Sequence, residues 1–89
     1  MKLEIISVDK IEFSGNVNSV NLPGTKGQFT VLENHASLIA SLSNGVIKYK
    51  MDNIEHEFPI ESGFCEVNNN QVSVCIERNK NGESDAKVK

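Results

Sequence analysis

The feature that most constrains this sequence is a strict alternation of apolar and polar side chains over residues 54–61. The segment alternates Ile54, His56, Phe58 and Ile60 with Glu55, Glu57, Pro59 and Glu61. Successive side chains of a β-strand point to opposite faces, so this period is that of a half-buried strand. Shorter segments of the same kind recur along the chain, with turn residues between them about every eight to twelve residues. The pattern predicts an all-β sandwich or barrel.

Glycines and short polar pairs mark the expected turns. Asp52 and Asn53 separate two apolar segments with the spacing of a two-residue hairpin, and Pro59 inside a strand pattern predicts an edge strand or a bulge. We also expect glycines to supply the positive φ angles of the turns, because glycine adopts them without steric cost. These glycines are Gly15, Gly24, Gly27, Gly45 and Gly63.

Residues 34–42 depart from the two-residue period, since Leu38 and Leu42 are four residues apart. The segment could form one helical turn or a bent strand that crosses between sheets. Because it is too short for a stable helix without caps, we expect the bent strand.

Composition predicts one small domain followed by a polar tail. The chain has 89 residues, of which 38% are apolar, which is enough for one modest core. We expect residues 1–77 to form the domain and residues 78–89, with only two apolar side chains, to form a frayed tail. No apolar run approaches the roughly 20 residues that cross a bilayer.

Charge argues against nucleic acid as a partner. The net charge is −3, and residues 1–77 hold five lysines against ten acidic side chains. An acidic body repels phosphate backbones, and no basic stripe interleaved with aromatic residues occurs.

The two cysteines are expected to remain reduced. Cys65 and Cys75 flank a predicted hairpin in which Val67 pairs with Val72. This register sends the two sulfur atoms to opposite faces of the sheet, so neither an internal disulfide nor a disulfide-linked dimer is expected. A metal site would need further ligands, and the two histidines are not at metal-ligand spacing.

No set of nucleophile, base and orienting group stands out, and we expect neither an enzyme nor a cofactor. Two non-enzymatic alternatives remain from the residues alone. One is a small β-sandwich binding module for a sugar or peptide. The other is a biotinyl or lipoyl carrier with Lys50 as the modified lysine, although such a lysine is expected at a hairpin tip.

The stretch from Phe13 to Tyr49 resembles the N-terminal domain of the epsilon subunit of the bacterial F-type ATP synthase, which is called delta in mitochondria. The family pattern combines a small-residue start, a Gly-x-x-Gly loop, a His-Ala-x-Leu turn and a Gly-apolar-Ile strand. The corresponding residues are Ser14-Gly15, Gly24 with Gly27 to Val31, Asn34-His35-Ala36 with Leu38, and Gly45-Val46-Ile47. The last hairpin also fits, and the resemblance covers about residues 3–77.

The resemblance implies a flattened sandwich of two five-stranded sheets, about ten short strands in all. It also implies a non-catalytic central-stalk subunit that ties the gamma subunit to the membrane c-ring, without nucleotide or metal of its own. Such a protein is peripheral to the membrane, by default on the cytoplasmic face of the bacterial inner membrane.

Two loops are implied as the contacts with the c-ring and gamma, and an exposed sheet face as an apolar surface for gamma. The candidate contact residues are Thr25, Lys26, Gln28, Glu33, Asn34, His35 and Ser37.

The sequence departs from the family pattern at informative places. Gln28 stands where the family has an acidic residue, which turns a charge-assisted contact into a neutral hydrogen bond. Asn34 replaces a glycine before His35, and asparagine tolerates positive φ. The family usually continues into a C-terminal helical hairpin that inhibits ATP hydrolysis in many members. These 89 residues carry no such helices, so we expect no inhibition of that type.

Overall fold

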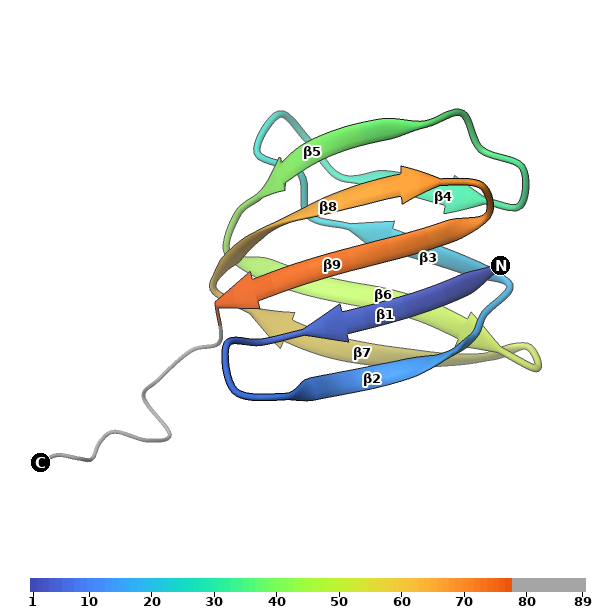
Figure 1. Cartoon of the computed structure of the whole chain (residues 1–89), viewed down its shortest axis with the longest axis horizontal. Helices are drawn as coiled ribbons and strands as arrows, with labels where there is room; N and C mark the ends of the chain where they lie inside the picture. Colours follow the sequence, from blue (N-terminus) through green and yellow to red (C-terminus); the bar gives the residue numbers. More distant parts are fainter. Residues whose placement is uncertain (78–89) are drawn as a thin grey trace, which may run out of the picture.

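The computed structural model describes residues 1–77, and every regular element in this range is a β-strand (Figure 1). The strands are β1 (Lys2–Ile6), β2 (Ile11–Asn16), β3 (Ser19–Leu22), β4 (Phe29–Leu32), β5 (Leu38–Leu42), β6 (Gly45–Met51), β7 (Ile54–Ile60), β8 (Ser62–Asn68) and β9 (Gln71–Glu77). The tail expected at residues 78–89 lies outside the described residues. No helix that could cross a bilayer is found between residues 1 and 77.

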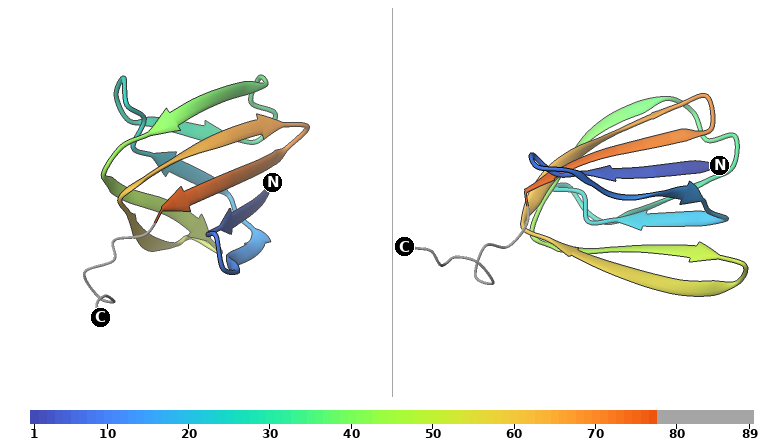
Figure 2. Two further views of the ribbon diagram at one scale, coloured as in Figure 1. Left: turned by 60° about the vertical axis from the view of Figure 1, so that its left-hand side comes forward. Right: turned by 60° about the horizontal axis from the view of Figure 1, so that its bottom comes forward.

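The strands form two sheets that face each other (Figure 2). One sheet has the order β2-β1-β9-β8-β5 and the other β4-β3-β6-β7. All neighbours are antiparallel except β1 and β9, which run parallel. The predicted sandwich is confirmed, but the second sheet has four strands instead of five within the described range. In place of a further strand after β3, an isolated β-bridge joins Gly24 to Leu42. The chain turns directly after this bridge, where Gly27 N–H donates to the Gly24 carbonyl oxygen at 3.0 Å.

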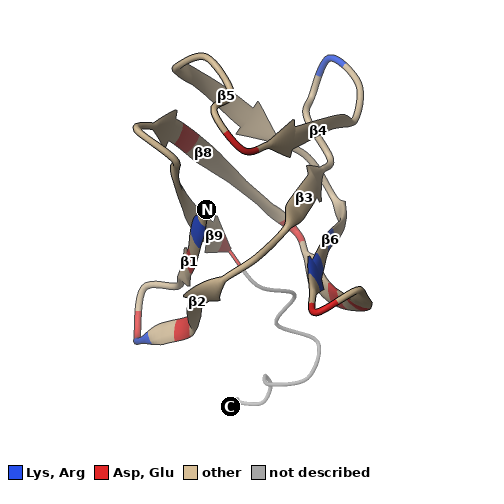
Figure 3. Cartoon of the chain, turned by 90° about the vertical axis from the view of Figure 1, so that its right-hand side faces the viewer, with Lys and Arg blue, Asp and Glu red and all other residues tan. Residues whose placement is uncertain are grey.

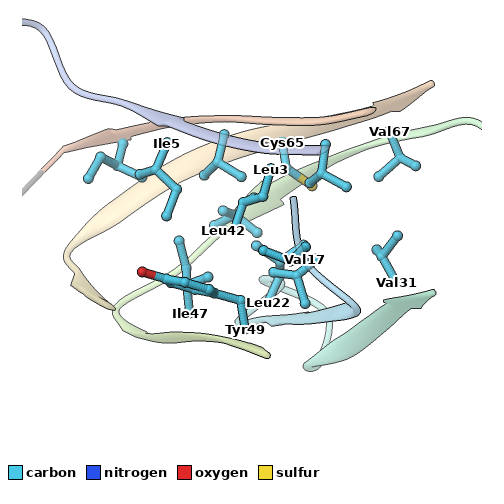
Figure 4. Packing of buried hydrophobic residues seen from close by; sticks show 14 of the residues in the cluster. Leu3, Ile5, Val17, Leu22, Val31, Leu42, Ile47, Tyr49, Cys65 and Val67 are labelled. Atoms are coloured by element: carbon cyan, nitrogen blue, oxygen red, sulfur yellow. The ribbon is translucent and has the colours of Figure 1, made fainter. Parts of the chain in front are cut away.

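The core lies between the two sheets and is built from one set of alternating side chains on each strand (Figure 4). No polar or charged residue in the described range is buried, so burial leaves no charged side chain in this range without a partner. The buried residues are Leu3, Ile5, Val17, Val20, Leu22, Val31, Leu42, Ile47, Tyr49, Ile60, Cys65, Val67, Val72, Val74 and Ile76.

Residues 34–42 form the bent crossing that the sequence predicts. β4 belongs to the four-stranded sheet and β5 to the five-stranded one, so the loop between them passes from one sheet to the other.

β4 and β5 are also edge strands of their sheets. β7, which contains Pro59, is the other edge of the four-stranded sheet, as predicted. Within β7 the exposed His56 pairs with Tyr49 of β6, and the two rings stack with centroids 5.3 Å apart.

The prediction that glycines supply the positive φ angles is wrong for four of the five. Of these glycines only Gly27 has positive φ, at 126°. Asparagine and aspartate take over this role, which their short polar side chains permit. The residues concerned are Asn34, Asp52, Asn53, Asn69 and Asn70, with φ between 52° and 67°. Paired left-handed residues are the signature of two-residue hairpin turns.

Gly15 and Gly63 lie within strands, so neither of them forms the turn expected of it. At Gly63 the reason for glycine is space. A Cβ atom there would lie 2.3 Å from the carbonyl oxygen of Cys75 and 3.0 Å from the Cα atom of Ile76. These atoms belong to the backbone of the neighbouring strand β9 and cannot move aside.

The hairpin of β8 and β9 has the predicted register. Val67 pairs with Val72, Cys65 with Val74 and Phe64 with Cys75. Cys65 is therefore buried and Cys75 exposed, and both thiols are free. Burial raises the pKa of the Cys65 thiol, partly opposed by a backbone hydrogen bond with Ala40.

We expect Gly63→Ala to lower the free energy of unfolding by about 1–3 kcal/mol, because the added methyl group collides with the backbone of β9. Urea denaturation followed by circular dichroism measures this. Glu66→Ala is the matched control: it lies on the same strand with an exposed side chain, and should change stability by less than about 0.5 kcal/mol. Equal effects of the two substitutions would contradict the packing at Gly63.

Thiol labelling of the native protein should proceed at one of the two cysteines only. Cys75 is exposed and reacts rapidly, whereas Cys65 is buried with its thiolate disfavoured. Mass spectrometry after brief treatment with iodoacetamide should find the label on Cys75, and the second label only after unfolding in urea. Rapid native labelling of Cys65 would contradict the sandwich register.

Candidate functional site

The β3–β4 loop, residues 23–28, is held against strand β5 at one end of the sandwich. Thr25 N–H donates to the Ser41 carbonyl oxygen at 3.0 Å, and the two hydroxyl oxygens are 2.8 Å apart. Gly24 is packed tightly, because a Cβ atom there would lie 2.7 Å from the Gly27 carbonyl oxygen. The loop is therefore fixed at its base, while Thr25, Lys26 and Gln28 are exposed.

A shallow pocket of about 280 Å³ lies between this loop and β5. Its apolar lining includes the half-buried Phe29 and the exposed Ile39. Its polar lining includes Thr25, Lys26 and Ser41. A mixed surface of this kind suits a polar protein loop with one apolar side chain.

The β4–β5 loop, residues 33–37, begins with a tight turn. His35 N–H donates to the Leu32 carbonyl oxygen at 3.1 Å, and Asn34, the third residue of the turn, has φ of 67°. This combination is that of a type II turn, which favours glycine or asparagine at the third position. The expectation that Asn34 preserves a turn built for glycine is confirmed.

Two asparagines of the β8–β9 turn, Asn69 and Asn70, line the same polar pocket as this loop. The pocket measures about 440 Å³ and is lined by Asn34, His35, Ala36, Ser37, Asn69 and Asn70. Asn34 N–H donates to Asn70 Oδ1 at 2.6 Å, and Asn70 Nδ2 donates to Asn34 Oδ1 at 3.1 Å. Ser37 Oγ donates to Asn68 Oδ1 at 3.1 Å. The amino terminus lies 3.9 Å from Glu33 Oε2.

The structure divides the candidate contact residues into two groups at opposite ends of β4 (Figures 1 and 3). Thr25, Lys26 and Gln28 precede this strand, and the remaining residues follow it. Four strand residues span about 13 Å, so the two groups do not form one continuous site. The second group consists of Glu33, Asn34, His35 and Ser37.

An apolar row on the outer face of the five-stranded sheet was not identified residue by residue from the sequence. Phe64 and Ile39 are 54% and 76% exposed. Phe64 lies opposite Ser41 on one side and Cys75 on the other, and Cys75 lies opposite Ile6. The signal that could have found Phe64 is its position between the inward-facing Gly63 and Cys65 register positions, which sends its ring outward.

Within residues 1–77 the arrangement offers surfaces for contact with a partner. No group of three or more His, Cys, Asp or Glu side chains that could hold a metal occurs within residues 1–77. Burial raises the pKa of Tyr49, which keeps its phenol neutral in the core. Lys50 lies inside β6 opposite Glu55 and Ser19, away from the hairpin tip at Asp52 and Asn53, so it does not fit a biotinyl or lipoyl carrier.

Comparison with known proteins shows the family. Residues 1–82 match the ATP synthase delta/epsilon chain β-sandwich domain. The ATP synthase epsilon chain of Chlorobium limicola is 40% identical over 77 residues, which is 85% of this chain and 88% of that protein. The epsilon chain of Leptospira interrogans is 35% identical over 74 residues, and there the match covers 83% of this chain but 58% of the relative.

Two solved structures have the same fold at lower identity. A chain of the Euglena gracilis mitochondrial ATP synthase, in an OSCP/F1/c-ring structure, has a TM-score of 0.79 and 19% identity. It covers 83% of this chain and 48% of that one. A chain of the Tetrahymena thermophila mitochondrial ATP synthase central stalk and c-ring has a TM-score of 0.73 and 12% identity. The match covers 99% of this chain and 73% of that one. The sandwich, its loops and these relatives together place the chain in the β-sandwich domain family of ATP synthase delta/epsilon chains.

Proposed function

We propose that this chain is the epsilon-type subunit of an ATP synthase central stalk, a non-catalytic part that ties the gamma subunit to the c-ring. The observation that carries the proposal is the match to the Chlorobium limicola epsilon chain, which spans 88% of that relative at 40% identity. The role is mechanical: a rigid β-sandwich transmits torque through its surfaces, so proton-driven rotation of the ring reaches the catalytic head.

The two ends of the sandwich serve two partners in this proposal. The β3–β4 loop, with Gln28 at the position where the family has an acid, meets polar loops of the c-ring. Its exposed Lys26 and Thr25 supply further hydrogen bonds. The β4–β5 loop lies at the other end of β4, so it faces gamma.

The outer face of the five-stranded sheet extends the proposed gamma surface. A shallow apolar pocket of about 380 Å³ connects the β4–β5 loop to this face and is lined by Ser37, Leu38, Ile39, Glu66, Val67 and Asn68. Phe64 lies opposite Ser41, two positions along β5 from Ile39, so the two exposed side chains are diagonal neighbours on this face. Exposed apolar side chains gathered on one sheet face are typical of a protein-docking surface.

Epsilon chains belong to the F1 part of ATP synthase, which is peripheral to the membrane. We infer that this chain lies on the cytoplasmic face of a bacterial inner membrane, and its similarity to bacterial epsilon chains supports this. A stand-alone binding module for a sugar or peptide is the remaining alternative, and no feature of the surface favours it over a stalk subunit.

We expect the 89-residue chain to restore proton-driven ATP synthesis when it is added to an ATP synthase depleted of epsilon. ATP hydrolysis by the same complex should not fall, because no inhibitory helix occurs within residues 1–77. Paired assays of synthesis and hydrolysis measure the two effects, with a family member that carries the helical hairpin as control. Inhibition as strong as that of the control would contradict this expectation, and failure to restore synthesis would contradict the proposed function.

The double substitution Ile39→Ala with Phe64→Ala should weaken binding to gamma by about ten- to a hundredfold. Full burial of a large apolar side chain contributes about 1.5–3 kcal/mol, and we expect docking to cover each of these two side chains only in part. Calorimetry with the isolated gamma subunit measures the affinity. Ile54→Ala is the matched control, since Ile54 is 61% exposed on β7 of the other sheet. A larger loss of affinity from Ile54→Ala than from the double substitution would contradict this surface and would indicate that gamma binds the four-stranded sheet.

A further inference from the structure

A reciprocal pair of hydrogen bonds joins two turns that are far apart in the sequence. Asn34 N–H donates to Asn70 Oδ1 at 2.6 Å, and Asn70 Nδ2 donates to Asn34 Oδ1 at 3.1 Å. The two residues are 36 positions apart. The pair uses both side-chain amides at once, so removal of either side chain breaks the reciprocal bond, and removal of Asn70 also frees the Asn34 amide.

Backbone conformation alone does not require asparagine at either position. Asn34 has φ of 67° at the third place of a type II turn, and Asn70 has φ of 61° in the two-residue turn between β8 and β9. Glycine fits both places at least as well, and it is the family residue before His35. Asparagine adds what glycine lacks, which is a side chain that reaches the other turn.

The β8–β9 turn is a firm support for this contact. It closes a hairpin of seven paired positions in the interior of the five-stranded sheet. Val67 and Val72, the pair nearest the turn on the inner face, are 1% and 0% exposed. The carbonyl oxygen of Asn70 also accepts a hydrogen bond of 2.9 Å from Lys2 N–H. Strand β1 therefore fixes the backbone of Asn70, whose side chain binds Asn34 of the β4–β5 loop.

The loop is attached to this support at both of its ends. Asn34 is bound at its start, and Ser37 Oγ donates to Asn68 Oδ1 at 3.1 Å near its end. His35 lies between these two attachments, half-buried, with its Nδ1 atom 2.7 Å from the Ala36 carbonyl oxygen.

We propose that Asn70 is a positioning residue: through its reciprocal bonds with Asn34 it locks the β4–β5 loop and presents His35 in one orientation to the partner that docks there. The partner surface in this statement rests on the proposed function, whereas the lock itself does not. A loop ordered before docking loses less conformational entropy on binding, which raises affinity without adding a contact.

The closest test of the lock is hydrogen exchange of the Asn34 amide in the 89-residue chain, followed by NMR. Asn70→Gly removes both bonds and keeps a residue suited to the left-handed turn, so the hairpin should fold normally. The Asn34 amide should then exchange about five- to tenfold faster, as expected for the loss of one or two exposed hydrogen bonds. Asn69→Gly is the matched control: it lies in the same turn with φ of 53°, and should leave exchange at Asn34 unchanged.

A double-mutant cycle separates the pair from general loosening of the loop. Asn34→Gly alone removes only the bond from Asn70 Nδ2, because the Asn34 backbone N–H can still donate to Asn70 Oδ1. It should therefore weaken the loop less than Asn70→Gly, judged by exchange at the His35 amide, and the double variant should behave like Asn70→Gly. Additive effects would overturn the reciprocal pair. Unchanged exchange in Asn70→Gly, or an equal increase in Asn69→Gly, would overturn the lock.

Binding to epsilon-depleted ATP synthase tests the positioning role. Asn70→Gly should lower affinity by about three- to tenfold, while Asn69→Gly should match the native chain. All three proteins should be fully folded at the temperature of the binding assay, as checked by circular dichroism. Faster exchange without any loss of affinity would overturn the positioning role. If the native chain does not bind the complex, the proposed function fails, and the exchange measurements alone then support or overturn the lock.

Discussion

The structure depends on the burial of one set of alternating side chains between two sheets. Strands of both sheets commit inner positions to this interface, and no buried polar group weakens it within residues 1–77. A chain of this size has room for one such core, so the inner faces are fully used for stability. The surfaces left for function are the outer faces and the loops at the two ends.

This division explains how a molecule can have a defined role through its surfaces alone. Torque transfer needs a body that does not deform and contacts that do not slide. The sandwich supplies the body, while the fixed bases of the two loops restrict motion at the contacts. At one end Thr25 is bound to Ser41, and at the other Asn34 is bound to Asn70. In both cases a loop between strands is attached to an element that is distant in sequence.

Local patterns in the sequence were sufficient for the strands and several turns. The strand over residues 54–60 and the pairing of Val67 with Val72 follow from the period of two, and the structure has both. The half-buried pattern expected for residues 54–60 is wrong for most of the strand, because only Ile60 is buried there and Ile54 is 61% exposed. The reason for glycine at Gly63 was not predictable, because it depends on the Cys75 carbonyl of another strand.

The layout of the candidate site was predictable only in part. The two loops were identified, but their separation depends on β4 and β5 belonging to different sheets, which no local pattern reveals. The contact of Asn34 with Asn70 is likewise set by the tertiary fold. The outward position of Phe64 follows from alternation once the register of β8 is known.

Site-specific photo-crosslinking in an assembled ATP synthase tests the two-ended arrangement most directly. A photoreactive residue is placed at Lys26 in one protein and at Ser37 in another, both exposed. The account predicts crosslinks to the c-ring subunit from position 26 and to gamma from position 37. Crosslinks from both positions to the same subunit, or to neither partner, would contradict it.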